Sequence, residues 1–146
     1  MDLTGERLIP ANRQSVWDGL NDPEVLKACI PGCQSLEKSS ETELSATVVT
    51  KLGPVKAKFS GDVKLENINA PESYTISGEG KGGIAGFAKG SADVVLEETP
   101  DGTLLKYTVD AKVGGKLAQL GSRLIDSTAK KLADQFFDDF AEKIAS

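Results

Sequence analysis

Histidine is absent from the 146-residue chain. Its absence excludes Ser-His-Asp and Cys-His catalysis, His-liganded zinc sites and acid–base chemistry by imidazole. An enzyme made from this sequence would have to use carboxylates, lysine, tyrosine or cysteine. We therefore expect a protein that is not an enzyme, with no catalytic residues, no metal ligands and no cofactor.

Cysteine is also scarce, since only Cys29 and Cys33 occur. Two cysteines are too few for a disulfide framework, and in a reducing compartment we expect free thiols. A redox pair would take the form Cys-x-x-Cys at a helix N-terminus, where the helix dipole lowers the thiol pKa. Here the two residues flank the end of a short helix and a turn, which favours small buried residues over a redox or metal site.

Long apolar runs are missing as well. None approaches the roughly 20 residues of a membrane span, and Met1 is followed by charged and polar residues rather than by a signal peptide. The net charge of −5 disfavours binding to a phosphate backbone. We expect a cytoplasmic protein that binds no nucleic acid.

What the sequence does contain is alternation of apolar and polar residues from Gln34 to Val113, which is typical of strands with one buried face. The clearest case is residues 55–65, and the turn signals Gly53-Pro54 and Pro100-Asp101-Gly102 divide the pattern. A further strand is expected at residues 3–9. Together these segments predict an antiparallel sheet of about six to seven strands.

Two short helices should follow the first strand. Asn12 can cap a helix that carries Val16 and Trp17 on one side. Asp22 can cap the next helix, with Pro23 at its first position. Helices this short have little stability of their own, so we expect them to plug one end of the sheet.

A long helix should close the chain, because apolar residues recur at steps of three and four after Gly115. We predict this helix from about Lys116 to Ala145, a length of about 45 Å. Its single apolar stripe has only the sheet to pack on, and a helix lying across a curved sheet can enclose a space. The stripe consists of Leu117, Leu120, Leu124, Leu132, Phe136, Phe140 and Ile144.

The residues on the inner side of the strands are small for a solidly filled interior. Alanine or glycine occupies positions 46, 57, 61, 78 and 111. Either the helix lies very close to the sheet or a void remains, since native interiors are normally close-packed. The sequence leaves both alternatives open.

Glycine is concentrated in residues 78–90, where Gly78, Gly80 and Gly83 match the G-x-G-x-x-G pattern of dinucleotide sites. Such a site needs a helix directly after the glycines, and no helical pattern occurs before Lys116. We therefore predict a hairpin with glycine-enabled bends. In a sharper version of this hypothesis the hairpin opens over a cavity mouth, with Phe87 as its apolar tip.

Short motifs are spread over the whole chain: Val16-Trp17 ahead of Asn-Asp-Pro-Glu-Val-Leu, then Ala-Cys-Ile-Pro-Gly-Cys, Leu-Gly-Pro-Val-Lys, the glycine-rich residues 78–90, and Gly-Gly-Lys-Leu-Ala-Gln-Leu-Gly-Ser-Arg-Leu-Ile-Asp. In this order they resemble the CoxG family of carbon monoxide dehydrogenase proteins, within the START/Bet v 1-like (SRPBCC) superfamily. The resemblance implies an α+β helix-grip fold over residues 1–146 as a single domain. In such a fold a curved antiparallel sheet wraps a long C-terminal helix around an apolar cavity.

The resemblance also implies a role. Members of this family are expected to accompany molybdenum hydroxylases of the carbon monoxide dehydrogenase type, in recruitment or maturation, and to handle a lipophilic molecule such as a quinone. Our leading hypothesis is a non-enzymatic accessory protein that binds a hydrophobic small molecule, lipid- or quinone-like, between sheet and helix. Longer members are expected to contact the membrane through a C-terminal tail. This chain ends at Ser146, so a peripheral position at the inner membrane face stays an alternative that no tail supports.

The predicted ligand site combines sheet and helix residues. We expect Tyr107 to supply the hydroxyl that orients the ligand. The predicted cavity walls are Phe59, Leu105, Tyr107, Leu120 and Leu124, and the predicted portal is Leu26, Ile30 and Phe87.

Two other functions stay open. The first is a protein–protein adaptor with a vestigial cavity, suggested by the glycine-rich hairpin around Phe87 and by the acidic end of the last helix. The second is a cyclase- or hydrolase-type enzyme, since related folds host such activities. The lack of histidine and of a convergent polar cluster disfavours the enzyme.

Overall fold

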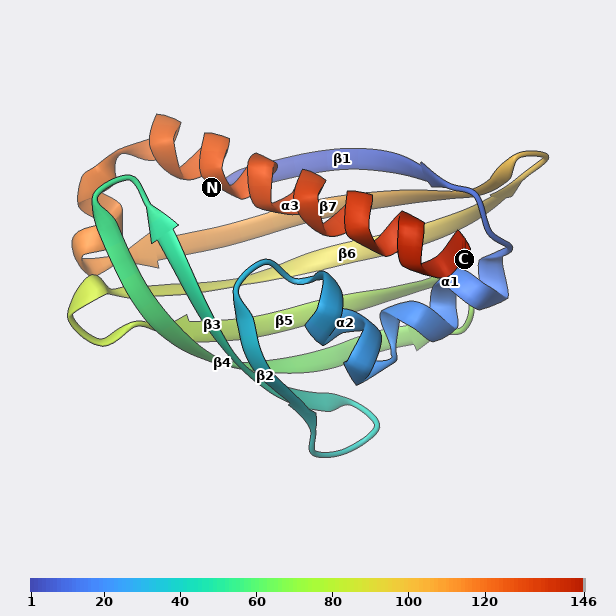
Figure 1. Cartoon of the computed structure of the whole chain (residues 1–146), viewed down its shortest axis with the longest axis horizontal. Helices are drawn as coiled ribbons and strands as arrows, with labels where there is room; N and C mark the ends of the chain where they lie inside the picture. Colours follow the sequence, from blue (N-terminus) through green and yellow to red (C-terminus); the bar gives the residue numbers. More distant parts are fainter. Residues whose placement is uncertain (146) are drawn as a thin grey trace.

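A seven-stranded antiparallel sheet forms most of the computed structural model, which describes residues 1–145 (Figure 1). The strand order is β1-β7-β6-β5-β4-β3-β2, so strands β2 to β7 follow one another as hairpins and β1 adds to the edge at β7. The predicted α+β class and strand number are confirmed. The strands are β1 (Asp2–Ile9), β2 (Cys33–Lys38), β3 (Glu43–Leu52), β4 (Val55–Asn69), β5 (Ser73–Lys81), β6 (Phe87–Thr99) and β7 (Gly102–Gly114).

The two short helices form where the capping residues predict them. In α1 (Arg13–Leu20) the Asn12 side chain accepts a hydrogen bond from the Ser15 backbone N–H at 2.8 Å. In α2 (Pro23–Cys29) the Asp22 carboxylate accepts one from the Glu24 N–H at 2.9 Å. Each cap satisfies a backbone donor that the first turn of a helix leaves free.

The C-terminal helix begins later than the sequence analysis predicted. A 3₁₀ helix, η2 (Gly115–Leu120), comes first, and α3 (Ser122–Ala145) follows it. Gly121 separates the two with φ of +87°, a left-handed conformation that glycine adopts far more readily than other residues. The predicted start at Lys116 is therefore wrong, because the chain turns at Gly121 before the α-helix begins.

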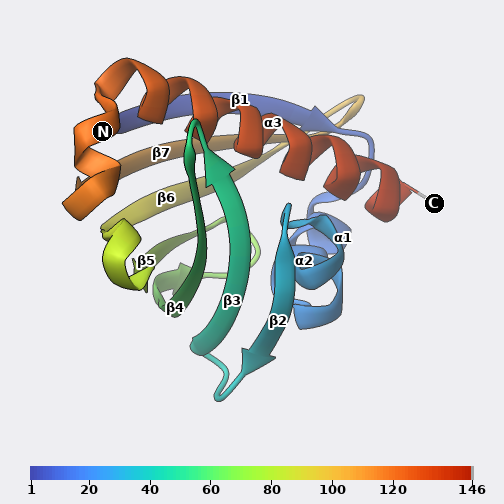
Figure 2. The same ribbon diagram turned by 60° about the vertical axis from the view of Figure 1, so that its left-hand side comes forward.

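The helix lies across the concave side of the sheet. Figures 1 and 2 show α3 running beside β1 and over the strands that curve away beneath it, with α1 and α2 at the end of the molecule where α3 finishes. An ion pair between Arg7 of β1 and Asp138 of α3 ties the helix to the edge of the sheet. The helices thus cover one face only.

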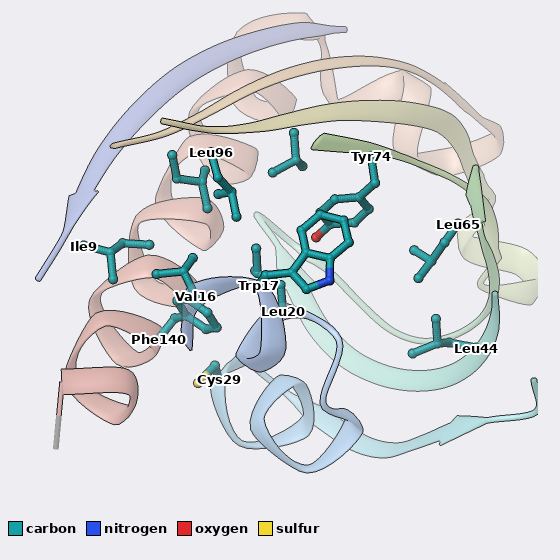
Figure 3. Packing of buried hydrophobic residues seen from close by; sticks show 12 residues of the cluster. Ile9, Val16, Trp17, Leu20, Cys29, Leu44, Leu65, Tyr74, Leu96 and Phe140 are labelled. Atoms are coloured by element: carbon teal, nitrogen blue, oxygen red, sulfur yellow. The ribbon is translucent and has the colours of Figure 1, made fainter. Parts of the chain in front are cut away.

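The hydrophobic core lies under the C-terminal half of α3. Phe140 and Ile9 are fully buried there, together with Val16 of α1 (Figure 3). Aromatic rings extend this contact, because Phe136 stacks on Phe140 with ring centres 5.6 Å apart. Phe137 stacks on Tyr107 of β7 at 5.3 Å. These rings fix the helix to both α1 and the sheet.

We predict that Phe140→Ala lowers the free energy of unfolding by about 3–5 kcal/mol, because the substitution leaves a cavity in this closely packed region. Urea denaturation followed by circular dichroism measures the loss. Gln135→Ala, at an exposed position of the same helix, should change stability by no more than about 0.5 kcal/mol. A loss below about 1 kcal/mol for Phe140→Ala would contradict the role given to this ring.

Candidate functional site

An apolar cavity of about 260 Å³ lies between the sheet and the helices. Residues from six strands and all three α-helices surround it, so it forms only in the folded chain. Its size is near the lower end of cavities that take small organic ligands, about 300 Å³. The lining residues are Leu20, Asn21, Leu26, Ile30, Leu36, Lys38, Leu44, Ala46, Val63, Leu65, Tyr74, Ile76, Val94, Leu105, Phe136 and Phe137.

The cavity exists because inward-facing side chains on β3 to β5 are too short to meet the helix. Ala46, Val63 and Ile76 lie on the inner side of the sheet, yet each is only half-buried. Ala46 is one of the small residues that the sequence analysis singled out. Of the two alternatives left open there, a void is the one that the structure shows.

Polar groups are few in the lining. Among the lining residues, only Asn21, Lys38 and Tyr74 carry a polar side-chain group. The Asn21 amide donates a hydrogen bond to the Trp17 carbonyl at 2.9 Å. Lys38 lines the cavity and is also exposed to solvent, so the cavity opens on this side, beside Leu26 and Ile30 of α2.

Tyr74 is the buried polar residue of the cavity. It is 4 % exposed, and its ring points from β5 into the interior, edge-on to Trp17 at 5.2 Å between ring centres (Figure 3). Burial raises the pKa of the Tyr74 hydroxyl well above its usual value of 10.0, so the group stays protonated and neutral. Within residues 1–145, its oxygen and hydrogen have no hydrogen-bond partner.

Three of the eight predicted site residues lie at this cavity. Leu105 forms part of its wall, and Leu26 and Ile30 lie at its open side, the place predicted for a portal. Whether they contact a ligand stays a prediction.

The other five predicted residues lie outside this lining. Tyr107 is covered by Phe137, and its hydroxyl lies over Gly5 of β1. The remaining four belong to the end of the molecule with the glycine-rich hairpin, because the sequence pattern tells which side of a strand faces inward but not how far along the strand the cavity extends. Phe59 lies against Gly82, Leu124 against Gly53, and Phe87 against Gly114, while Leu120 ends η2.

The glycine-rich hairpin has the predicted form. Strand β5 leads through a 3₁₀ turn, η1 (Gly83–Ala85), into β6. Its apolar tip is Ile84, which is 86 % exposed, whereas Phe87 is 43 % exposed. The tip residue was missed because the sequence alone does not say which residue of a glycine-rich turn points outward.

Two wider hollows lie on the outer side of the sheet, with volumes of about 820 and 520 Å³. Both are lined by serines and by charged residues of both signs, such as Asp62, Glu79 and Lys89. These side chains are exposed and well solvated, so the hollows lack the apolar burial that binds small organic molecules. The inner cavity is therefore the better candidate site.

The comparisons with known proteins agree with the geometry. The family model for CoxG, a component of carbon monoxide dehydrogenase, matches residues 5–145. The chain belongs to the CoxG family. No curated protein is similar enough in sequence to match. The family resemblance found in the sequence is thus confirmed for this CoxG member.

Solved structures place the CoxG member in the helix-grip, START/Bet v 1-like fold. A conserved protein from Geobacillus kaustophilus is 33 % identical with a TM-score of 0.93, covering 99 % of this chain and 95 % of that one. Ara h 8.0201 is 18 % identical with a TM-score of 0.69, covering 99 % and 97 % of the two chains. A protein from Chromobacterium violaceum is 12 % identical with a TM-score of 0.77, covering 99 % and 97 %. The predicted helix-grip fold is confirmed.

Neither a metal cluster nor a membrane-spanning helix occurs in the described part of the chain. No three His, Cys, Asp or Glu residues there are placed to hold a metal ion. No helix in residues 1–145 is both long and apolar enough to cross a membrane. Cys29 and Cys33 are both free, the first buried and the second half-buried.

We predict that both thiols react slowly at pH 7 and that Cys33 reacts before Cys29. Burial raises the pKa of each thiol above 9.0, with the Asp139 carboxylate adding to the effect at Cys29. The thiolate is the reactive form, so labelling by iodoacetamide should speed up as the pH rises through and beyond 9. Mass spectrometry of timed samples gives the order; labelling of Cys29 first, in folded protein, would contradict the prediction.

Proposed function

We propose that this CoxG family member is a non-enzymatic accessory protein that binds a hydrophobic small molecule, lipid- or quinone-like, in the cavity under α3. The observation that carries the proposal is the cavity itself, an apolar space of about 260 Å³ that opens beside α2. Each 100 Å² of apolar ligand surface buried there would contribute roughly 2.5 kcal/mol toward binding. Family membership supports the same role.

The chemistry of the lining supports binding rather than catalysis. The residues that line the cavity include no carboxylate, serine, threonine or cysteine. A cyclase or hydrolase needs a nucleophile or an acid–base pair within reach of the substrate. The hypothesis of an enzyme therefore has little support from this site.

The partner that we propose for the loaded protein is a molybdenum hydroxylase of the carbon monoxide dehydrogenase type. The CoxG family supports this association, with a role in recruitment or maturation of the dehydrogenase.

A peripheral position at an anionic membrane surface is supported by one end of the molecule. The exposed Ile84 lies there among basic residues, although the whole chain has a net charge of −5. Lys81 of β5 pairs in register with Phe87 of β6, and Lys89 with Lys112 of β7. A lysine near an anionic bilayer contributes about 1 kcal/mol, and an apolar tip can enter the interface.

The alternative is a protein–protein adaptor with an empty, vestigial cavity. The exposed Ile84 and Phe87 favour it, because large apolar side chains at the surface often mark contact sites. Binding of a dehydrogenase subunit without any recovered ligand would support the adaptor over the carrier.

We predict that Ala46→Trp weakens binding of the fluorescent probe N-phenyl-1-naphthylamine at least about tenfold, because the indole would fill the cavity that the ligand needs. Fluorescence titration measures the dissociation constant. Ala118→Trp, at an exposed position in η2, should leave the constant within about twofold of the unchanged protein. Equal binding by both variants would contradict the proposed cavity function.

We also predict that Ile84→Asp lowers binding to vesicles of phosphatidylcholine and phosphatidylglycerol at least about fivefold, since a carboxylate at the tip is repelled by the anionic surface. The control is Ile68→Asp at the far end of β4, where the isoleucine is 47 % exposed and the charge change is the same. Co-sedimentation at low and high salt gives the bound fraction. Similar losses for the two variants would argue against a membrane contact at η1.

A further inference from the structure

We propose that the Tyr74 hydroxyl is the hydrogen-bond donor that orients the cavity ligand, and that this ligand is a neutral molecule with an oxygen acceptor, such as a ketone, quinone or ester carbonyl. The inference rests on the proposed function and names the ligand class for the same cavity. It differs from the expectation drawn from the sequence, where Tyr107 supplies the hydroxyl.

The burial of an unpaired hydroxyl carries this inference. Tyr74 lines the cavity and is only 4 % exposed, and no group among residues 1–145 accepts or donates a hydrogen bond at its oxygen. A buried polar group without a partner costs free energy, and phenylalanine would fill the same space without that cost. A ligand oxygen in the cavity would supply the missing partner.

The surroundings of Tyr74 decide the charge of the ligand. Burial holds the pKa of the hydroxyl above its usual value, so at neutral pH the group donates a proton in a hydrogen bond without itself being charged. The only cation of the lining, Lys38, is exposed to solvent. A carboxylate or phosphate placed at Tyr74 would lose its hydration without a buried cation to compensate, whereas a carbonyl loses little. The deep end therefore fits a neutral oxygen.

The Tyr74 ring is also held in one position before any ligand binds. Tyr74 pairs in register with Val94 of β6, and its ring lies edge-on against Trp17 of α1. Both neighbours are buried. A donor fixed in this way binds with little further loss of conformational entropy, which favours affinity and a single ligand orientation.

A matched pair of ligands tests the inference. Fluorenone and fluorene have the same tricyclic shape, and only fluorenone has a carbonyl oxygen. Each would compete with N-phenyl-1-naphthylamine for the unchanged protein, for Tyr74→Phe and for Tyr107→Phe. We expect Tyr74→Phe to weaken fluorenone about tenfold, as for one hydrogen bond lost in an apolar site, and to leave fluorene within about twofold.

The control variant changes the other tyrosine of the chain. Tyr107 is covered by Phe137 and lies outside the lining, so Tyr107→Phe should change neither ligand by more than about twofold. Unchanged fluorene binding also shows that the Tyr74→Phe cavity is intact. If Tyr74→Phe leaves fluorenone unaffected, or weakens both ligands equally, the inference is wrong while the carrier function stands. Failure of the unchanged protein to bind either ligand or the probe would overturn both.

Discussion

The packing of Phe140 under the last turns of α3 is the contact on which the rest of the structure depends. Phe140 is fully buried against α1 and the sheet, and Phe136 stacks on it. A single amphipathic helix has little stability in water, so this contact is what keeps α3 over the sheet. Because the helix is held firmly at this end, it spans the curved sheet beyond it without collapsing onto the small residues of β3 and β4. The cavity is a consequence of that rigid support.

The interior therefore combines two kinds of surface that usually exclude each other. One part is filled by aromatic rings at crystal-like density, and the next part is lined by side chains that reach no partner. Val63 and Ile76 are inward-facing and only half-buried, and Tyr74 adds an unpaired hydroxyl to this apolar lining. Such an arrangement is stabilised once an apolar molecule with one polar atom enters. A binding protein fits this energetic pattern better than a catalyst does, since no reactive group lines the space.

The charge distribution adds a second level of organisation. The chain is acidic as a whole, with Asp138 paired to Arg7 at one end of α3. At the other end of the molecule Lys81, Lys89 and Lys112 surround an exposed apolar turn. An asymmetry of this kind orients a small protein toward an anionic surface over distances of about a Debye length, roughly 8 Å at physiological ionic strength. Such an orientation would act on the molecule before any specific contact forms.

Local features of the sequence determined the elements: the caps Asn12 and Asp22, the alternation along the strands and the apolar stripe of α3 all act over a few residues, and each has its predicted counterpart. Gly121 was misjudged because a helical spacing of apolar residues continues through a 3₁₀ turn as well as through an α-helix. Only the tertiary structure decided which inward-facing residues meet a void. Tyr74 and Tyr107 both point inward from neighbouring parts of one sheet, and nothing nearby in the chain distinguishes them. Phe137 covers Tyr107, while the space beside Tyr74 stays open, because the position of α3 across the sheet depends on contacts between residues far apart in sequence.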